Sequence, residues 1–306
     1  MDLSFNSLSK SIPSTLTKLQ QLEILDLGRN ELTGELPHGI PYALTKLKEF
    51  NVARNMGLFG TVFDYTTTVG VDYDASHVVG GSQVEILDLS DCSFTGTISH
   101  QSLEYFKNLD ILRIHGNGLS GHLPTTSPTL TSLMIFTAYS NAFSGPVPWS
   151  WIGSNNDLTI LDLSKNYLTG TIPSDIGNLG ELDVVRLEGN MLSGTIPTEI
   201  GNMSNLTVLD LSFNSIQGML PDEIGNCSLL RSISIARNQL TGTLPTNVGS
   251  LLQLEYLDIS FNDMHGTLPP HIGNCTSLEK LEVDSNNFNG TVPRELSKLS
   301  MLRKYL

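Results

Sequence analysis

The sequence predicts an α/β solenoid in which about twelve short units each add one strand to a parallel sheet. The pattern L-x-x-L-x-L-x-x-N-x-L recurs along the whole 306-residue chain. Its marker position recurs at steps of 24, 25, 37, 25, 24 and 25 residues, and then at five steps of 24. Because a unit of this length cannot bury a hydrophobic face alone, neighbouring units must stack to form a core.

One residue, an asparagine in all units but one, marks the same slot in every unit, and we call this set the ladder. An asparagine side chain bonds backbone groups where a strand turns away from its sheet. Stacked once per unit, such side chains would also satisfy the buried turns of their neighbours. The ladder comprises Asn6, Asn30, Asn55, Cys92, Asn117, Asn141, Asn166, Asn190, Asn214, Asn238, Asn262 and Asn286.

The segment before each ladder slot has the two-residue period of a half-buried strand. In LTILDLSKN, Leu161 and Leu163 are expected to point inward, and Asp162 and Ser164 outward. A G-x-I-P or G-x-L-P segment follows. Its glycine allows a tight bend, and its proline lacks the N–H that a central strand of a sheet needs for pairing. A short return stretch such as SDIGNLGEL then leads to the next strand.

The longer phrase N-x-L-x-G-x-I-P-x-x-I-G-x-L-x-x-L, on its 24-residue period, resembles the plant-type leucine-rich repeat over nearly the whole chain. That subclass forms the ectodomains of receptor-like kinases and receptor-like proteins, and also the polygalacturonase-inhibiting proteins. The resemblance implies a curved, twisted arc with a parallel sheet on its concave face and a second short sheet at the G-x-I-P segment. It also implies that ligands bind the concave or lateral surface.

Residues 1–306 are expected to form a single solenoid that is uncapped at both ends. The chain opens as MDLSFNSL, already inside a strand, and stops at LRKYL, inside the next one. Since solenoids need capped ends, we interpret the chain as a fragment. It contains no signal peptide and no apolar run near the ~20 residues of a membrane helix.

Two irregular segments interrupt the repeats. The 37-residue step carries an insertion loop, residues 63–82, which is either part of a binding face or a surface loop without a role. In PVPWSWIG, one of Trp149 and Trp151 is expected to replace the aliphatic anchor of the return stretch. For the other we favour core or partial packing over exposure on the convex side.

The position between the two inward leucines forms an outward column with seven acidic and two basic members: Asp2, Asp26, Asn51, Asp88, Arg113, Thr137, Asp162, Arg186, Asp210, Ser234, Asp258 and Glu282. Like charges opposite each other on adjacent strands are destabilising. Arg186, between Asp162 and Asp210, and Arg113, after Asp88, should reduce this repulsion. Because aspartate is common here in the family, the column is weak evidence for a cation site.

The slots just before the ladder vary more and supply most of the candidate ligand contacts on the concave or lateral surface. Aromatic residues and arginine are enriched at interaction hot spots. The alternative is that S-F-N is repeat consensus and that its phenylalanines only cover the edge of the sheet. The candidates are His115, Tyr139, Lys165, Glu188, Phe213, Arg237, Tyr256 and Phe261.

The cysteines and the potential glycosylation sequons indicate the redox state and the cellular location of the chain. Cys227 and Cys275 should lie two strands apart, roughly 10 Å at ~4.8 Å per strand, which is too far for a disulfide; we expect buried free thiols. Five sequons mark candidate glycosylation sites: Asn202, Asn205, Asn226, Asn274 and Asn289. An extracellular location is indicated by the family resemblance more than by the number of these sequons.

Motifs for catalysis, metal binding or cofactor binding were not found, so we predict a non-enzymatic chain without a cofactor. A net charge of −14 disfavours nucleic acid as a partner. We hypothesise that the chain is an extracellular sensing domain of a cell-surface receptor-like protein and binds a protein, peptide or glycan. A co-receptor is a possible further partner, and this segment is not expected to insert into a membrane. The alternatives are a secreted inhibitor of a cell-wall hydrolase and an intracellular interaction scaffold.

Overall fold

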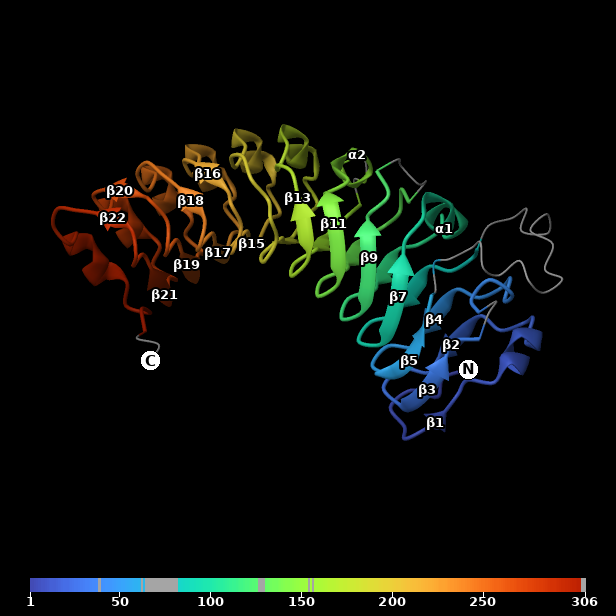
Figure 1. The fold of residues 1–306 in the computed structure, drawn as a ribbon. Coiled ribbons are helices and arrows are strands. Elements are labelled where there is room, and N and C mark those ends of the chain that lie inside the picture. Colours follow the sequence, from blue (N-terminus) through green and yellow to red (C-terminus); the bar gives the residue numbers. More distant parts are fainter. Residues whose placement is uncertain are drawn as a thin grey trace. The chain divides into compact units, whose positions relative to one another are not determined.

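The computed structural model describes residues 1–37, 40–61, 63, 82–125, 130–153, 155 and 157–303. The chain divides into two compact units, Met1–Leu158 and Thr159–Leu306, which are drawn in Figure 1 and described separately below. The insertion loop predicted at residues 63–82 lies outside the described residues except for its end residues, Phe63 and Ser82.

The main sheet of the first unit is parallel, with strands in chain order. Its pairing register is the predicted one, since Asp26 pairs with Asn51, Asn51 with Asp88, and Asp88 with Arg113. An isolated bridge joins Asp2 to Asp26 ahead of the first strand. The strands are β2 (Ile24–Asp26), β4 (Glu49–Asn51), β6 (Ile86–Asp88), β8 (Ile111–Arg113) and β10 (Ile135–Thr137).

A second set of parallel strands in this unit lies just after the ladder residues: β1 (Ser9–Lys10), β3 (Glu31–Glu35), β5 (Gly57–Gly60), β7 (Ser93–Thr97), β9 (Gly118–His122) and β11 (Ala142–Pro146). These strands end at or near the glycine of G-x-I-P, so the second sheet begins slightly earlier in each repeat than expected. The helices of the return stretches are η1 (Ser14–Lys18), α1 (His100–Tyr105) and α2 (Trp149–Ile152).

The second unit repeats this plan with greater regularity. Its main parallel strands are β12 (Ile160–Asp162), β14 (Val184–Arg186), β15 (Val208–Asp210), β17 (Ser232–Ser234), β19 (Tyr256–Asp258) and β21 (Lys280–Glu282). Its short second strands are β13 (Tyr167–Thr169), β16 (Gln217–Gly218), β18 (Gln239–Leu240), β20 (His265–Gly266) and β22 (Asn287–Phe288). Its return stretches are 3₁₀ helices: η4 (Ser174–Asn178), η5 (Thr198–Asn202), η6 (Asp222–Asn226), η7 (Thr246–Ser250), η8 (Pro270–Asn274) and η9 (Arg294–Lys298).

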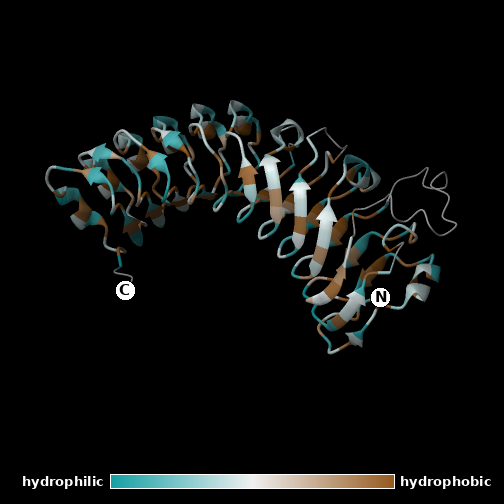
Figure 2. Cartoon of the chain, in the orientation of Figure 1, coloured by the Kyte–Doolittle hydropathy of each residue, from teal (hydrophilic) through white to brown (hydrophobic). Residues whose placement is uncertain are grey.

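The core of each unit is built from the inward residues of the strands together with the return stretches. Leu161 and Leu163 are 0% exposed, as are Ile233 and Leu257 at the position of Leu161 in later repeats. Asp162 and Ser164, which were expected to point outward, are also buried, at 7% and 2%. Figure 2 shows hydrophobic residues along the strands and hydrophilic ones recurring in the loops and return stretches. Proline precedes each of η4 to η9 as its N-cap, where the missing N–H breaks no sheet pairing.

The tryptophan-containing return stretch packs as expected. Trp151 is 2% exposed and occupies the slot that Ile176 fills in a later repeat. Its indole N–H donates to the carbonyl oxygen of Pro124 at 2.7 Å, and its ring centroid lies 5.7 Å from that of Phe136. Trp149, the first residue of α2, is half-buried, which agrees with the favoured partial packing.

The ladder asparagines bind the repeats to one another, as the sequence predicted. The side-chain amide of Asn190 donates to the carbonyls of Leu187 in its own repeat at 3.0 Å and of Leu163 in the preceding repeat at 3.0 Å. Its side-chain oxygen accepts the N–H of Leu168 at 2.9 Å. The side chain of Asn190 therefore satisfies buried backbone groups of two successive turns.

Cys92 fills a ladder slot with a different chemistry. Its thiol contacts the carbonyl oxygens of Val52 at 3.3 Å and Ser90 at 3.5 Å. The thiol lacks the amide oxygen that would accept an N–H from the preceding repeat. The N–H of Leu58 instead donates to the carbonyl of Asn55 at 2.9 Å.

Cys227 and Cys275 are free and fully buried, which confirms their predicted role as apolar fillers. Each directly follows a 3₁₀ helix, and its thiol contacts a carbonyl of the preceding repeat, that of Ile200 or of Val248. Burial raises the pKa of both thiols, and also that of Cys92, to about 11.

Asn190→Ala should lower the free energy of unfolding by ~1–3 kcal/mol, because it leaves buried backbone groups unpaired. Asn178→Ala is the matched control, since Asn178 is exposed at the end of η4. Chemical denaturation of the two variants measures the difference, and equal midpoints would show that the ladder register is wrong.

The three cysteines should react with Ellman's reagent at pH 8 only after unfolding, because the thiolate is the reacting species and each site is buried with a raised pKa. Stopped-flow absorbance in buffer and in denaturant measures the two rates. A thiol that reacts rapidly in the native protein would contradict the burial described above.

Candidate functional site

The aspartates of the outward column terminate their strands. Oδ1 of Asp210 accepts the N–H of Ser212 at 3.0 Å and its hydroxyl at 2.6 Å, and Asp258 binds Ser260 in the same way. Such local side-chain hydrogen bonds replace the backbone pairing of the sheet where a strand ends. These contacts give the column a structural explanation that requires no bound cation.

The slot directly before each ladder residue has an unusual backbone conformation. All ten of its non-glycine occupants have φ between 51° and 58°, the left-handed region that residues other than glycine and asparagine rarely adopt. Among them are Phe213, Arg237 and Phe261. Held in this way, the side chains project from the end of the sheet, and Phe213 and Phe261 are 56% and 43% exposed.

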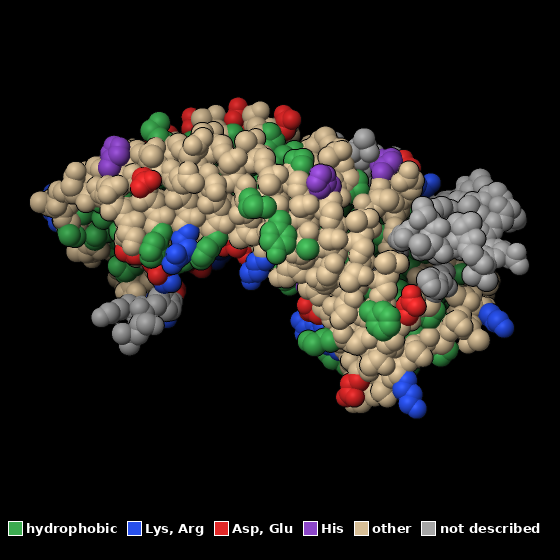
Figure 3. All heavy atoms as spheres, in the orientation of Figure 1, with side chains coloured by type: hydrophobic (Ala, Val, Ile, Leu, Met, Phe, Trp, Pro, Cys, Tyr) green, Lys and Arg blue, Asp and Glu red, His purple; other side chains and the backbone are tan. Residues whose placement is uncertain are grey.

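Three successive repeats of the second unit place these residues in one stack. The guanidinium carbon of Arg237 lies 4.0 Å from the ring centroid of Phe261 and 5.1 Å from that of Phe213. Figure 3 shows a basic side chain between two hydrophobic ones in the region of β17 and β19. We call Phe213, Arg237 and Phe261 the aromatic–arginine stack.

Tyr256 anchors a second cluster on the same face. Its hydroxyl lies 3.0 Å from a carboxylate oxygen of Asp258 and 2.9 Å from one of Glu282. Lys280 lies over the tyrosine ring at 5.0 Å and 3.0 Å from Glu282. Burial, followed by the Glu282 carboxylate, raises the pKa of Tyr256, so its hydroxyl keeps its proton and separates two like charges on paired strands.

Glu188 stands among acidic neighbours. Its Oε2 is buried without a hydrogen-bond partner. Burial, followed by the charges of Asp210 and Asp162, raises the pKa of this carboxyl. Lys165, another candidate, is exposed at the left-handed slot of its own repeat.

The remaining two candidates belong to the first unit. The rings of His115 and Tyr139 stack with centroids 4.2 Å apart and an interplanar angle of 11°. Nδ1 of His115 lies 2.9 Å from the hydroxyl of Thr137. The structure therefore pairs these residues with each other, and groups Phe213, Arg237 and Phe261 separately in the second unit.

The sequon asparagines lie away from the outward sheet face. Asn202, Asn226 and Asn274 are exposed at the last residues of η5, η6 and η8. Asn289 is exposed just after β22, whereas Asn205 is half-buried and donates to Glu181 at 3.0 Å. Modification of these side chains stays a prediction.

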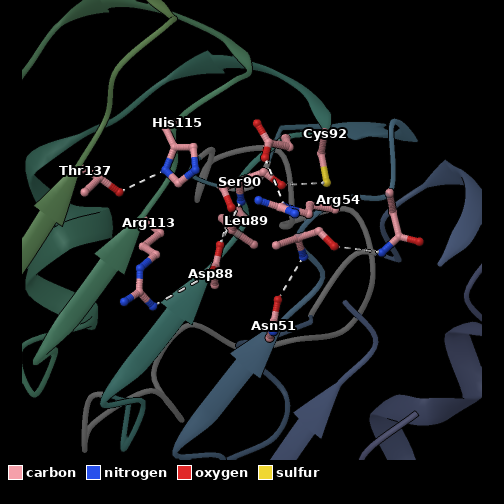
Figure 4. Close-up of polar contacts among 12 residues, drawn as sticks. Asn51, Arg54, Asp88, Leu89, Ser90, Cys92, Arg113, His115 and Thr137 are labelled. Atoms are coloured by element: carbon pink, nitrogen blue, oxygen red, sulfur yellow. Dashed lines mark hydrogen bonds and ion pairs between the residues drawn. The ribbon is translucent and has the colours of Figure 1, made fainter. Parts of the chain in front are cut away.

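The sequence reasoning missed a basic hollow of about 360 Å³ on the sheet face of the first unit. Figure 4 shows part of it, with Arg54, Arg113, Asp88 and His115 around the ends of β4, β6 and β8. A signal existed in the phrases GRN and ARN, which place arginine before the ladder in two successive repeats. The hollow is lined by Ser4, Phe5, Gly28, Arg29, Asn51, Ala53, Arg54, Asp88, Ser90, Arg113 and His115.

Within the residues that the structure describes, no group of His, Cys, Asp and Glu side chains is arranged to hold a metal ion. Over the same residues, no helix has the length and hydrophobicity needed to span a bilayer.

Stacked parallel strands, an asparagine ladder and a variable outward face define a repeat protein of the leucine-rich class. The family model described as Leucine Rich Repeat matches residues 21–43, 83–103, 157–179, 205–227, 229–251, 253–275 and 277–299. These segments make up more than half of the chain. The chain belongs to the leucine-rich-repeat family.

Plant receptor-like proteins are among its relatives. Receptor-like protein 35 of Arabidopsis thaliana is 36% identical over 175 residues, covering 56% of this chain and 16% of the relative. Receptor-like protein 32 of the same plant is 44% identical over 175 residues, covering 56% of this chain and 18% of the relative. The matched regions thus span less than a fifth of these two relatives.

Similar solved structures include plant receptors. The Arabidopsis receptor kinase HAESA, in complex with the peptide hormone IDA and the co-receptor SERK1, has a TM-score of 0.78 and 28% identity, covering 100% of this chain and 52% of that chain. A TDR receptor has a TM-score of 0.81 and 29% identity, covering 98% of this chain and 54% of that one.

Glu188→Gln should raise the melting temperature at pH 7 by about 1–3 °C. Because the pKa of Glu188 is raised in the folded chain, the folded state holds this proton more tightly than the unfolded state. Stability therefore falls as the pH rises between the ordinary and the raised pKa, and the advantage of glutamine should vanish below about pH 4. Melting curves of the wild type and the variant between pH 4 and pH 7 measure this difference in melting temperature.

Glu31→Gln, at an exposed position of the first unit, provides the control for this measurement. A Glu188→Gln variant with the wild-type melting temperature at pH 7, or with an advantage that persists at low pH, would contradict the electrostatic explanation.

Proposed function

We propose that the chain is part of the extracellular recognition region of a plant receptor-like protein and binds a peptide or protein ligand. The observation that carries the proposal is the aromatic–arginine stack, Phe213, Arg237 and Phe261. Two plant receptor-like proteins that share 36% and 44% identity with this chain support the proposal. The structurally similar receptor kinase HAESA, which binds a peptide hormone, supports it too.

The stack has the chemistry of an interaction hot spot. Exposed phenylalanine rings offer apolar area, and arginine adds directional hydrogen bonds. The two rings already position the guanidinium of Arg237, at 4.0 and 5.1 Å from their centroids. Preorganisation of this kind lowers the entropy that a ligand must lose on binding.

The fold itself does not require these side chains. The ladder asparagines and the inward residues hold the repeats together, whereas Phe213 and Phe261 remain largely exposed. At the same slot other repeats carry Lys165 or Ser285, so the position tolerates very different side chains. Variation at a position that the core does not constrain is suited to ligand specificity.

The surrounding charge favours a ligand with apolar and basic groups. The outward column of the second unit has Asp162, Asp210, Asp258 and Glu282 against a single basic residue, Arg186. A basic side chain of the ligand would therefore be attracted to the strands beside the stack.

Placement of the sequons agrees with an extracellular chain. Asn202, Asn226 and Asn274 end the return helices, so glycans at these residues would leave the outward sheet face open for a ligand. In the same proposal the parent protein carries a membrane anchor, and a co-receptor is a further partner.

The combined Phe213→Ala and Arg237→Ala variant should bind a ligand at least about tenfold more weakly, roughly 1.4 kcal/mol, without a change of fold. Ligands would be selected from a displayed peptide library against wild-type protein, and affinities measured by calorimetry. Circular dichroism of the variant would confirm the fold.

Tyr167→Ala with Met191→Ala is the matched control, because both residues are exposed apolar side chains of the same unit that follow the ladder rather than precede it. Equal losses in the two double variants would contradict a role for the stack. Unchanged affinity in the stack variant, with a loss on deleting residues 63–82, would move the site to the insertion.

A further inference from the structure

The basic hollow of the first unit stands apart from the charge of the chain as a whole. Its lining contains three guanidinium groups, those of Arg29, Arg54 and Arg113, and one carboxylate, that of Asp88. The chain as a whole has a net charge of −14. Carboxylates also border the hollow, since Asp26 accepts the N–H of Gly28 and Asp91 contacts Arg54. Three guanidiniums that line one hollow still provide a concentration of N–H donors suited to an anion.

Each arginine is positioned without using up its hydrogen-bonding capacity. The guanidinium of Arg29 lies over the ring of Phe5 at 4.4 Å. Arg54 Nε is 3.5 Å from Asp91, and Arg113 lies 3.8 Å from Asp88. Both separations exceed the ~2.7–2.9 Å of a charge-assisted hydrogen bond, and each guanidinium has five N–H donors. Donors therefore remain for a ligand.

The neighbouring column of the same sheet face is mostly apolar. Ile86, Ile111 and Ile135 occupy the first outward position of adjacent strands, and Ile24 lies two strands before Ile86. Ile24 is 44% exposed, and the other three are half-buried. Glu49 interrupts this column between Ile24 and Ile86. Aliphatic side chains beside a group of guanidiniums form a surface for a ligand that is both apolar and acidic.

We infer that this hollow binds the carboxylate side chains of an extended acidic peptide. The guanidiniums of Arg29 and Arg54 lie on successive repeats and match the planar fork of a carboxylate. Alternate residues of an extended peptide would lie over the isoleucine column. The site belongs to the first unit alone and does not depend on the aromatic–arginine stack.

The test uses a fluorescein-labelled, C-terminally amidated peptide, Gly-Leu-Glu-Leu-Glu-Leu-Gly, and its counterpart with glutamine in place of glutamate. Fluorescence anisotropy should show at least tenfold tighter binding of the glutamate peptide to the 306-residue chain. Arg29→Gln with Arg54→Gln should weaken that binding tenfold or more, and Arg29→Lys with Arg54→Lys should lose less.

Lys18→Gln with Lys48→Gln is the control, because it makes the same change in net charge at exposed positions of the same unit outside the hollow. The lysine variant should leave the Kd of the glutamate peptide within twofold of the wild-type value. The combined Phe213→Ala and Arg237→Ala variant should do the same, which distinguishes this inference from the proposed function. Equal binding of the two peptides, or equal losses in the arginine and lysine variants, would overturn the inference. Melting curves would establish that each variant is folded.

Discussion

The asparagine ladder is the interaction on which the rest of the structure depends. Each repeat must turn sharply at the end of its strand, and the turn leaves backbone groups with no strand partner. Asn190 binds the carbonyls of its own repeat and the preceding one, and accepts an N–H from that preceding repeat. Because an unpaired buried backbone group costs ~1–3 kcal/mol, the register of the repeats follows the register of these side chains.

Cys92 shows how far this requirement can be relaxed. A thiol contacts two of the carbonyls that an asparagine would bind, but it offers no comparable acceptor to the preceding repeat. The backbone compensates locally, since the N–H of Leu58 turns to the carbonyl of Asn55. This exception falls at the 37-residue step, where the spacing of the repeats also changes.

The outward face divides into positions that serve the fold and positions that the fold leaves unconstrained. Asp210 and Asp258 end their strands by binding a serine two residues later, so their recurrence has a structural cause. The left-handed slot differs, because it holds phenylalanine, arginine, lysine or serine with the same φ. Backbone strain of order 1–3 kcal/mol per residue at this slot must be offset by the ladder and core around it.

Taken by themselves, the residues determined the repeat register, the parallel sheet, the buried cysteines and the identity of the slot that carries Phe213, Arg237 and Phe261. These features follow from periodicity, which a single sequence displays directly. Only the tertiary structure decided that Arg237 lies between two rings, that Tyr256 separates Asp258 from Glu282, and that Arg29, Arg54 and Arg113 share one hollow. Those residues lie in different repeats, and the directions of their side chains depend on left-handed backbone angles and cross-strand contacts that the linear pattern does not encode.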